Sequence, residues 1–306
     1  NGDCHLPLTP VNMTTYSEGL RSAGEPGRPH RPQDVDEKGA QMKLEEFTDI
    51  RYEVEEDNHA VITIDRPDRM NSFRGRTVDE LISAFKHAWA DRRVAAVILT
   101  ATGERAFCTG GDVKERAETG GYGETEWGTF EIERLHRIIR DIPKPVIAAV
   151  NGIAIGGGHV LHVLCDLTVA AENATFAQAG PRVGSFDAGF GSAYLARVVG
   201  EKRARQIWFL LDRYDAVTAE RWGLVNEVVP KDELLETARA WARKIGSYSP
   251  TAIKFLKHSF NADTDHLSGI SHLAFDGLAH YATSEEGMEG ARAFAEKRPP
   301  DFSPYR

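Results

Sequence analysis

Cysteines and long apolar runs are both scarce in this sequence. Only three cysteines occur among the 306 residues, at Cys4, Cys108 and Cys165. They are too few and too far apart for a disulfide framework or a zinc site, so we predict free thiols, no metal centre and a reducing cytoplasm. No unbroken apolar stretch approaches the length that crosses a bilayer, so we predict a soluble protein without a membrane partner.

Positive charge is also in deficit. The chain has 37 Lys and Arg residues against 46 Asp and Glu, which gives a formal net charge of -9 and a pI near 5.7. Because phosphate binding needs a basic surface, this balance argues against nucleic acid as the main partner. With 41% hydrophobic residues, a chain of this length can bury the core of one large domain or two modest ones.

Hydrophobic periodicity is missing from residues 1–41. This stretch is rich in glycine, proline and charge, and it lacks the apolar segment of a secretory signal. We therefore predict that it is a disordered extension or a remnant of cloning, and that the first domain begins at Met42.

From there on, strand patterns alternate with helix patterns. The expected strands lie within 51–66, which forms two strands and a polar turn, and at 95–102, 146–150 and 167–171. Apolar residues at helical spacing predict helices at 77–93, 131–142 and 159–166 between them. This alternation indicates an α/β fold with mostly parallel pairing. After Glu201 we expect only helices, which would serve as a lid or an oligomer contact.

Two glycine clusters follow predicted strands. They are Thr109-Gly110-Gly111-Asp112 and Ile155-Gly156-Gly157-Gly158-His159, and each is expected to open a helix. Such positions offer free backbone N–H groups and the positive end of a helix dipole. Two amides that converge would form an oxyanion hole, in which each donor lowers a barrier by about 3 to 4 kcal/mol. The alternative is a pair of tight turns with close packing, and neither cluster matches a dinucleotide or P-loop motif.

The motifs AFCTGGD and KPVIAAVNGIAIGGGHVLHVLCDLTVAAENATFAQ resemble the crotonase, or enoyl-CoA hydratase/isomerase, superfamily over Lys43 to Arg306. The resemblance implies a spiral of strand-strand-helix repeats over residues 42–230 and a helical trimerisation region over 231–306. It also implies a homotrimer or a hexamer and a coenzyme A thioester as substrate. The oxyanion donors of that family match the amides of Gly111 and Gly157.

Two positions separate this chain from true hydratases. The family's two catalytic glutamates match Val160 and Gly180 here. Neither residue can act as a general acid or base, so ordinary enoyl-CoA hydration is not expected.

The segments FAQAGPRVGSFDAGFG, IWFLLDRYDA and EEGMEGARAFAEKRPPDFS are most similar to the 1,4-dihydroxy-2-naphthoyl-CoA synthases, which close a ring during menaquinone synthesis. This likeness implies that Ser185 and Asp187 act beside the reacting carbons. Some members hold a bicarbonate ion as a base, and the matching residues here are Gln178 and Trp208.

The same likeness implies further substrate contacts. Lys114 and Arg116 match residues that contact an aromatic acid, and Tyr122 matches a catalytic tyrosine. Arg74 matches an arginine near coenzyme A. Thr109 and Tyr281 complete the expected substrate-binding set, although Tyr281 stands one place before the family's tyrosine position, which holds Ala282.

The segments RPDRMNSFRG, AFCTGGD and LHRIIRDIPKPVIA are closer to 2-ketocyclohexanecarboxyl-CoA hydrolase, which opens a six-membered ring. Ring closure and ring opening both pass through a thioester enolate and both need a proton carrier. We therefore expect a carbon-carbon lyase or hydrolase, with naphthoyl-CoA synthesis as the first hypothesis and ring-opening hydrolysis as the alternative. An inactive scaffold is a further alternative.

Each of these side chains also has a structural interpretation. Asp187 could cap a helix. Trp208 could belong to the core, and Lys114 and Arg116 could lie on a solvated helix face. No carboxylate partner for His159 or His162 is evident in the sequence, so we expect both histidines to be structural.

Overall fold

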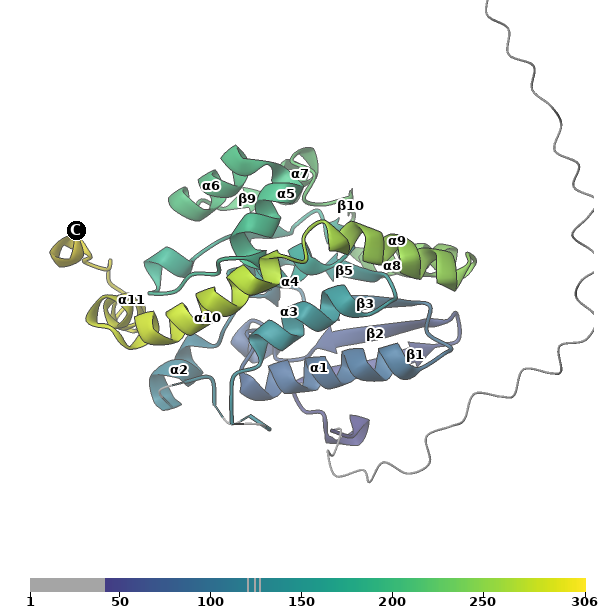
Figure 1. The fold of residues 1–306 in the computed structure, drawn as a ribbon, viewed down its shortest axis with the longest axis horizontal. Coiled ribbons are helices and arrows are strands. Elements are labelled where there is room, and N and C mark those ends of the chain that lie inside the picture. The colour runs from purple at the N-terminus through teal and green to yellow at the C-terminus, as the bar shows by residue number, and fades with distance from the viewer. Residues whose placement is uncertain (1–41, 120, 124, 127) are drawn as a thin grey trace, which may run out of the picture. The chain divides into compact units, whose positions relative to one another are not determined.

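Two β-sheets form the centre of this computed structural model (Figure 1). The structure describes residues 42–119, 121–123, 125–126 and 128–306, so Cys4 and the predicted extension lie outside it. The larger sheet has the order β1-β2-β3-β5-β7-β10. Its strands are β1 (Ile50–Glu55), β2 (His59–Ile64), β3 (Ala96–Ala101), β5 (Val146–Val150), β7 (Leu167–Ala171) and β10 (Glu227–Val229). β1 and β2 pair antiparallel, and every other pair is parallel.

Helices cover both faces of this sheet because its strands are apolar on both sides. The connecting helices are α1 (Gly75–Ala90), α3 (Ile132–Asp141) and α4 (Gly157–Leu164), and α8 (Leu234–Gly246) follows β10. In β3, Val97 and Leu99 belong to the core that contains residues of α1, α3 and α4. Ile98, which points the opposite way, packs in the cluster that contains Ala238 and Ala242 of α8. The predicted α/β fold is thus confirmed.

The smaller sheet was not predicted. It consists of β4 (Ala106–Cys108), β6 (Ile153–Ile155), β8 (Thr175–Ala177) and β9 (Tyr214–Asp215), in that order. Strands this short carry no clear alternation in the sequence. Because β4 and β6 pair in parallel, their carboxyl ends meet, and the two glycine clusters that follow them come together.

The remaining elements are helical: α2 (Val113–Thr119), α5 (Leu195–Val199), α6 (Glu201–Leu210), α7 (Ala216–Arg221), α9 (Pro250–Ala262), α10 (Leu267–Thr283) and α11 (Glu285–Ala295). The expectation of only helices after Glu201 was wrong, because β9 and β10 each complete a sheet edge. Two or three residues are too few to show a strand pattern. The boundary at residue 230 stays a prediction.

Cys108 and Cys165 are free, as predicted, and both are buried. Burial raises the pKa of the Cys108 thiol to about 12, so it is inert at neutral pH. Within the described part of the chain, no helix has the length and hydropathy to cross a membrane. The same residues contain no group of three or more His, Cys, Asp or Glu that could hold a metal ion.

Candidate active site

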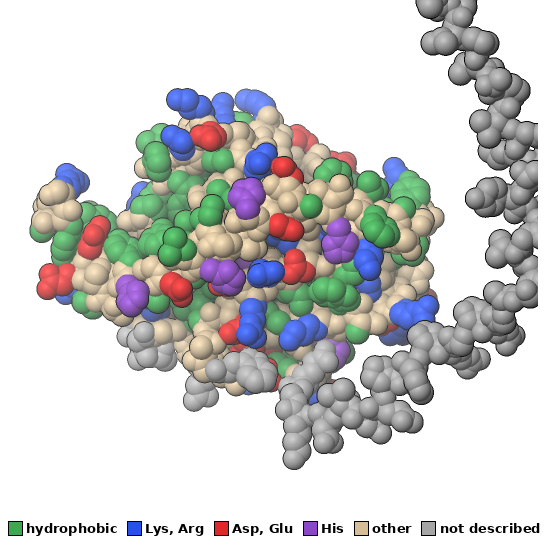
Figure 2. Space-filling view, viewed as in Figure 1, with side chains coloured by type: hydrophobic (Ala, Val, Ile, Leu, Met, Phe, Trp, Pro, Cys, Tyr) green, Lys and Arg blue, Asp and Glu red, His purple; other side chains and the backbone are tan. Residues whose placement is uncertain are grey.

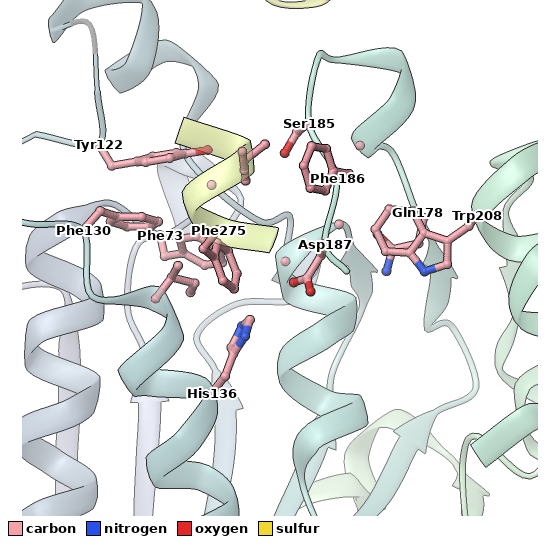
Figure 3. A pocket seen from close by; sticks show the side chains of 16 residues that line it. Phe73, Tyr122, Phe130, His136, Gln178, Ser185, Phe186, Asp187, Trp208 and Phe275 are labelled. Carbon is pink, nitrogen blue, oxygen red and sulfur yellow. The ribbon is translucent and has the colours of Figure 1, made fainter. Parts of the chain in front are cut away.

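A cavity of about 130 Å³ lies where the glycine clusters meet the loop of residues 180–191 (Figure 3). Its walls are largely aromatic. Gly111 and Gly157 line one side, Ser185 and Asp187 line another, and α3, α6 and α10 contribute His136, Trp208 and Phe275. The structure therefore brings together residues that are widely separated in the sequence.

The amides of Gly111 and Gly157 are available at this cavity. The Phe73 N–H donates to the Gly110 carbonyl over 2.9 Å, and the Asp112 N–H donates to the Phe73 carbonyl over 2.8 Å. These bonds flank Gly111 and leave its own N–H without a backbone acceptor among the described residues. Gly157 is the first residue of α4, where a helix N–H has no acceptor within the helix.

Both positions exclude a side chain. A Cβ atom added at Gly111 would lie 2.5 Å from the Tyr122 ring, and one added at Gly157 would lie 2.5 Å from the Phe73 ring. Gly110 has φ +84°, and an added Cβ would lie 2.9 Å from the Gly157 nitrogen. The glycines therefore allow the two backbone segments and the aromatic walls to pack closely around the amides.

The loop of residues 180–191 is held by its own backbone and by α3. The Gly180 carbonyl accepts hydrogen bonds from the amides of Val183 at 3.0 Å and Ser185 at 2.9 Å. After the loop, residues Phe190–Tyr194 form one turn of π-helix, a feature frequent at functional sites. The buried Arg140 guanidinium of α3 lies 4.6 Å from the Tyr194 ring centroid and fixes this turn.

Asp187 has one engaged oxygen and an unusual pKa. Its Oδ1 accepts the Gly191 N–H over 2.9 Å, near the start of the π-helical turn. Burial raises its pKa from 3.8 to about 7, and the Gly191 hydrogen bond only partly opposes this effect. A Cβ atom at Gly191 would lie 2.5 Å from the Asp187 carboxyl carbon. Asp187 thus both accepts a backbone N–H of the π-helical turn and carries a carboxyl group suited to proton transfer near neutral pH.

Hydroxyl groups lie on two walls of the same cavity. Tyr122 and Ser185 both line it, and Figure 3 shows their hydroxyls pointing toward one another. Burial raises the pKa of Tyr122, while Arg116 lowers it, so Tyr122 is a neutral donor at neutral pH.

The two positions of the hydratase glutamates are closed. Val160 is 1% exposed and belongs to the hydrophobic core. A Cβ atom at Gly180 would lie 2.6 Å from the Ser185 carbonyl oxygen, so the loop has no room for a side chain there. Neither position supplies a carboxylate in this structure.

Of the two residues expected to hold bicarbonate, one already has a hydrogen-bond partner and the other has none in the described structure. The Trp208 indole N–H donates to the Gly191 carbonyl over 2.7 Å, so it supports the π-helical turn. Gln178 is 2% exposed, and its amide oxygen and nitrogen have no partner in the described structure. The pair therefore does not fit the expected two-donor bicarbonate site, because Gln178 alone is free.

Several expected substrate contacts lie outside the cavity wall. Arg74 is bound by Asp49 through two hydrogen bonds of 2.8 and 2.9 Å. The Thr109 hydroxyl donates to the Met70 carbonyl over 3.3 Å. Lys114 is exposed and, with Arg182, borders a different cavity between α2 and the C-terminal residues. The roles of Arg74, Thr109 and Lys114 stay predictions.

Arg116 and Tyr281 lie near the site without lining it. Arg116 donates to the Ala282 carbonyl over 3.4 Å and interacts with the Tyr122 side chain. The Tyr281 ring packs 5.7 Å from the ring of Phe186, which lines the cavity. Both residues can therefore support groups that contact substrate.

His159 and His162 have structural surroundings. Both are fully buried, and His159 is hydrogen-bonded to the Tyr214 hydroxyl. Their rings pack against Phe176, and burial lowers the pKa of His159 to about 3. Neither lines the catalytic cavity.

His136 was not among the residues predicted from the sequence. This residue projects from α3 into the cavity wall beside Phe275 (Figure 3). It lies four residues after Ile132 and three before Ile139, on the buried face of the helix. A histidine among apolar residues at helical spacing is the signal that could have identified it.

Comparisons with known proteins agree with this architecture. A model of the enoyl-CoA hydratase/isomerase family matches residues 55–304. An enoyl-CoA hydratase from Mycobacterium avium subsp. paratuberculosis is 32% identical and has a TM-score of 0.74, with 84% of this chain and 99% of that chain covered. This chain belongs to the enoyl-CoA hydratase/isomerase family.

Two more solved structures extend the likeness. A carnitinyl-CoA hydratase from Mycobacterium avium is 32% identical, with a TM-score of 0.73 over 84% of this chain and 98% of that one. An enoyl-CoA hydratase from Bacillus anthracis is 31% identical, with a TM-score of 0.65 over 83% and 99% of the two chains. The protein is thus an acyl-CoA enzyme of the crotonase superfamily, and a coenzyme A thioester is the substrate class that fits it.

Proposed function

We propose that this enzyme breaks a carbon-carbon bond in a cyclic β-keto acyl-CoA, with a six-membered ring as the acyl group. The observation that carries the proposal is Asp187, whose pKa is raised to about 7 beside two available backbone amides. Both hydratase carboxylate positions are closed, so the proton chemistry falls to Asp187.

The reaction balances with water as the only co-reactant. The Asp187 carboxylate accepts a proton from water as the water oxygen adds to the ring ketone carbon. The bond from that carbon to the α carbon then breaks, and its electron pair forms the thioester enolate. The amides of Gly111 and Gly157 bind the enolate oxygen, each contributing about 3 to 4 kcal/mol. Protonated Asp187 returns its proton to the α carbon, which leaves a carboxylic acid and an intact thioester.

Cavity size supports a single ring. The volume of about 130 Å³ is close to that of a cavity known to bind benzene, about 150 Å³. A six-membered ring is of the size that fits this space.

Ring closure by a naphthoyl-CoA synthase reaction is the second candidate. The arrangement of Tyr122 and Arg116 favours it, because a hydroxyl in the cavity and a cation behind it suit an aromatic carboxylate. Lys114, the other cation expected for this role, borders a different cavity. We therefore place ring opening first.

Product mass separates the two reactions. The purified protein is incubated with 2-ketocyclohexanecarboxyl-CoA and, separately, with o-succinylbenzoyl-CoA, with Asp187→Asn as the control. Ring opening adds the mass of one water to the first compound, and ring closure removes one water from the second. Conversion of the second compound alone would reverse the ranking. Conversion of neither would overturn both reactions and favour an inactive scaffold.

The requirement for bicarbonate is tested in degassed buffer. Because the Trp208 N–H is bound to Gly191, we expect the same rate with and without added bicarbonate. Activation by bicarbonate would show that Trp208 exchanges its partner during catalysis.

Self-association as a trimer or hexamer is part of the proposal. Large apolar side chains are exposed on the later helices, among them Phe209, Phe255, Phe260 and Leu273. Hydrophobic side chains gather on the face between α6 and α10 (Figure 2). Patches of this kind mark interaction surfaces. Sedimentation at micromolar concentration is expected to show a trimer or hexamer, and a monomer would contradict it.

A further inference from the structure

His136 is a buried polar group that the proposed chemistry has not yet used. It lies in the second turn of α3 and is 1% exposed. Neither of its ring nitrogens has a hydrogen-bond partner in the described structure, although the residue lines the catalytic cavity. Figure 3 shows the imidazole pointing from the helix toward the space between Phe275 and Asp187.

The surroundings of this ring are apolar. Its centroid lies 5.9 Å from the Phe275 ring and 6.5 Å from the Phe190 ring. Burial lowers the pKa of His136 to about 3, so the imidazole is neutral at neutral pH. A neutral imidazole carries one N–H donor and one nitrogen acceptor.

Leaving these atoms unpaired is costly. A buried donor or acceptor without a partner destabilises a protein by about 1 to 3 kcal/mol. His159 is equally buried, but it lies away from the cavity and its Nε2 has the Tyr214 hydroxyl as a partner, so that only its Nδ1 is unpaired, whereas both nitrogens of His136 are. The difference indicates that the partner of His136 is a ligand in the cavity.

We propose that His136 donates a hydrogen bond to a second carbonyl oxygen of the acyl group, and so selects β-keto acyl thioesters over acyl groups without that oxygen. This inference rests on the proposed function, because it assigns the ring ketone to His136. The amides of Gly111 and Gly157 take the thioester oxygen on one side of the cavity. His136 then holds the ketone oxygen within reach of the water that Asp187 activates.

A comparison of two ligands tests this role without turnover. The proteins carry Asp187→Asn to prevent reaction, and calorimetry measures the affinity for 2-ketocyclohexanecarboxyl-CoA and for cyclohexanecarboxyl-CoA. The two ligands differ only by the ketone oxygen. His136→Leu is expected to weaken binding of the keto ligand by about 10- to 100-fold, the scale of a buried hydrogen bond, and to leave the other ligand unchanged.

Two further variants keep the test specific. His162→Leu removes another fully buried histidine, from α4 and away from the cavity, and should leave the preference for the keto ligand intact. His136→Gln retains a donor near the position of Nε2 and should restore part of that preference. The melting temperature of His136→Leu should equal or exceed that of the parent, because unpaired buried polar atoms are removed.

The outcomes separate this inference from the proposed reaction. Equal losses for both ligands in His136→Leu, or no loss for either, would overturn the role of His136 even if ring opening is observed. A selective loss for the keto ligand would support it even if the ring is not opened. If His136→Leu does not fold, the keto preference of His136→Asn, which cannot place a donor near Nε2, should fall below that of His136→Gln, and equality would overturn the inference.

Discussion

The two sides of the cavity are built on different principles. The amide side, formed by residues 108–111 and 156–158, presents backbone N–H groups at the ends of paired strands. The carboxyl side, formed by residues 180–191, presents side chains from a loop that ends in a π-helical turn. The amide side depends on the absence of side chains. The carboxyl side depends on the environment of one side chain, that of Asp187.

This contrast shows where the proposed reaction would depart from hydration. Amides that bind an enolate oxygen serve many reactions, so that side of the cavity carries little information about which bond changes. On the carboxyl side, Gly180 leaves no place for a glutamate, and Asp187 becomes the titrating group. In the proposed reaction, the carboxyl side therefore determines which bond changes.

The largest expected effect is that of Asp187→Asn on turnover. Asparagine keeps an oxygen for the Gly191 N–H but cannot accept a proton, so kcat should fall by about 10²- to 10⁴-fold. Steady-state kinetics on the substrate identified by mass measure this loss, and acyl-CoA affinity should stay near that of the wild type. Retention of more than about a tenth of the activity would move the proton chemistry to another group.

The same substitution should change how stability depends on pH. The pKa of Asp187 is raised in the folded state from 3.8 to about 7, so folding favours its neutral form. The contribution of this carboxyl group to the free energy of unfolding is fully present below pH 4, and it is lost as the pH rises to 7. At pH 8 the Asn variant should be more stable than the wild type by on the order of 2 to 4 kcal/mol, since one pKa unit is about 1.4 kcal/mol.

Urea unfolding at pH 4 and at pH 8 measures this difference. The extra stability of the Asn variant over the wild type should be much smaller at pH 4, where the wild-type carboxyl group is neutral in both the folded and the unfolded state. An equal difference at the two pH values would mean that burial does not shift the pKa of Asp187.

On the amide side, Gly157→Ala should act through sterics alone. The new Cβ would meet the Phe73 ring at 2.5 Å, so the Gly157 N–H must move. A displacement of about 1 Å can cost about 100-fold in rate, and we expect kcat to fall by that amount. Gly269→Ala in α10, where no atom lies within 4 Å of an added Cβ, should leave the rate unchanged.

The smallest effect is expected for Gly180→Ala. Its Cβ would lie 2.6 Å from the Ser185 carbonyl oxygen, so the loop must shift. We expect a loss of about 1 to 3 kcal/mol in the free energy of unfolding, the usual cost of overpacking. Denaturant titration measures it. Unchanged stability would show that the loop adapts easily and could accept a glutamate.

The fold was predictable to the extent that its elements are long. Helices were expected at 77–93 and 131–142, and α1 and α3 occupy Gly75–Ala90 and Ile132–Asp141. The strands of the smaller sheet escaped prediction because they have two or three residues. Their position depends on pairing with distant strands, which no local pattern reports.

The candidate site was predictable where glycines or a neighbouring pair of polar residues marked it. Gly111, Gly157, Ser185 and Asp187 do line one cavity. The behaviour of Trp208 and His136 was not predictable. The indole N–H finds its acceptor at Gly191, and the imidazole is enclosed by Phe190 and Phe275 from separate elements.

The sequence by itself determined which chemical groups this protein possesses: two glycine clusters, one aspartate in the GSFD segment, and no glutamate at the hydratase positions. The tertiary structure alone decided which groups are paired, which are buried and which face the cavity. The reason is physical, because a pKa and a free hydrogen-bonding atom depend on solvent exclusion and on partners. Both of these are set by segments far away along the chain.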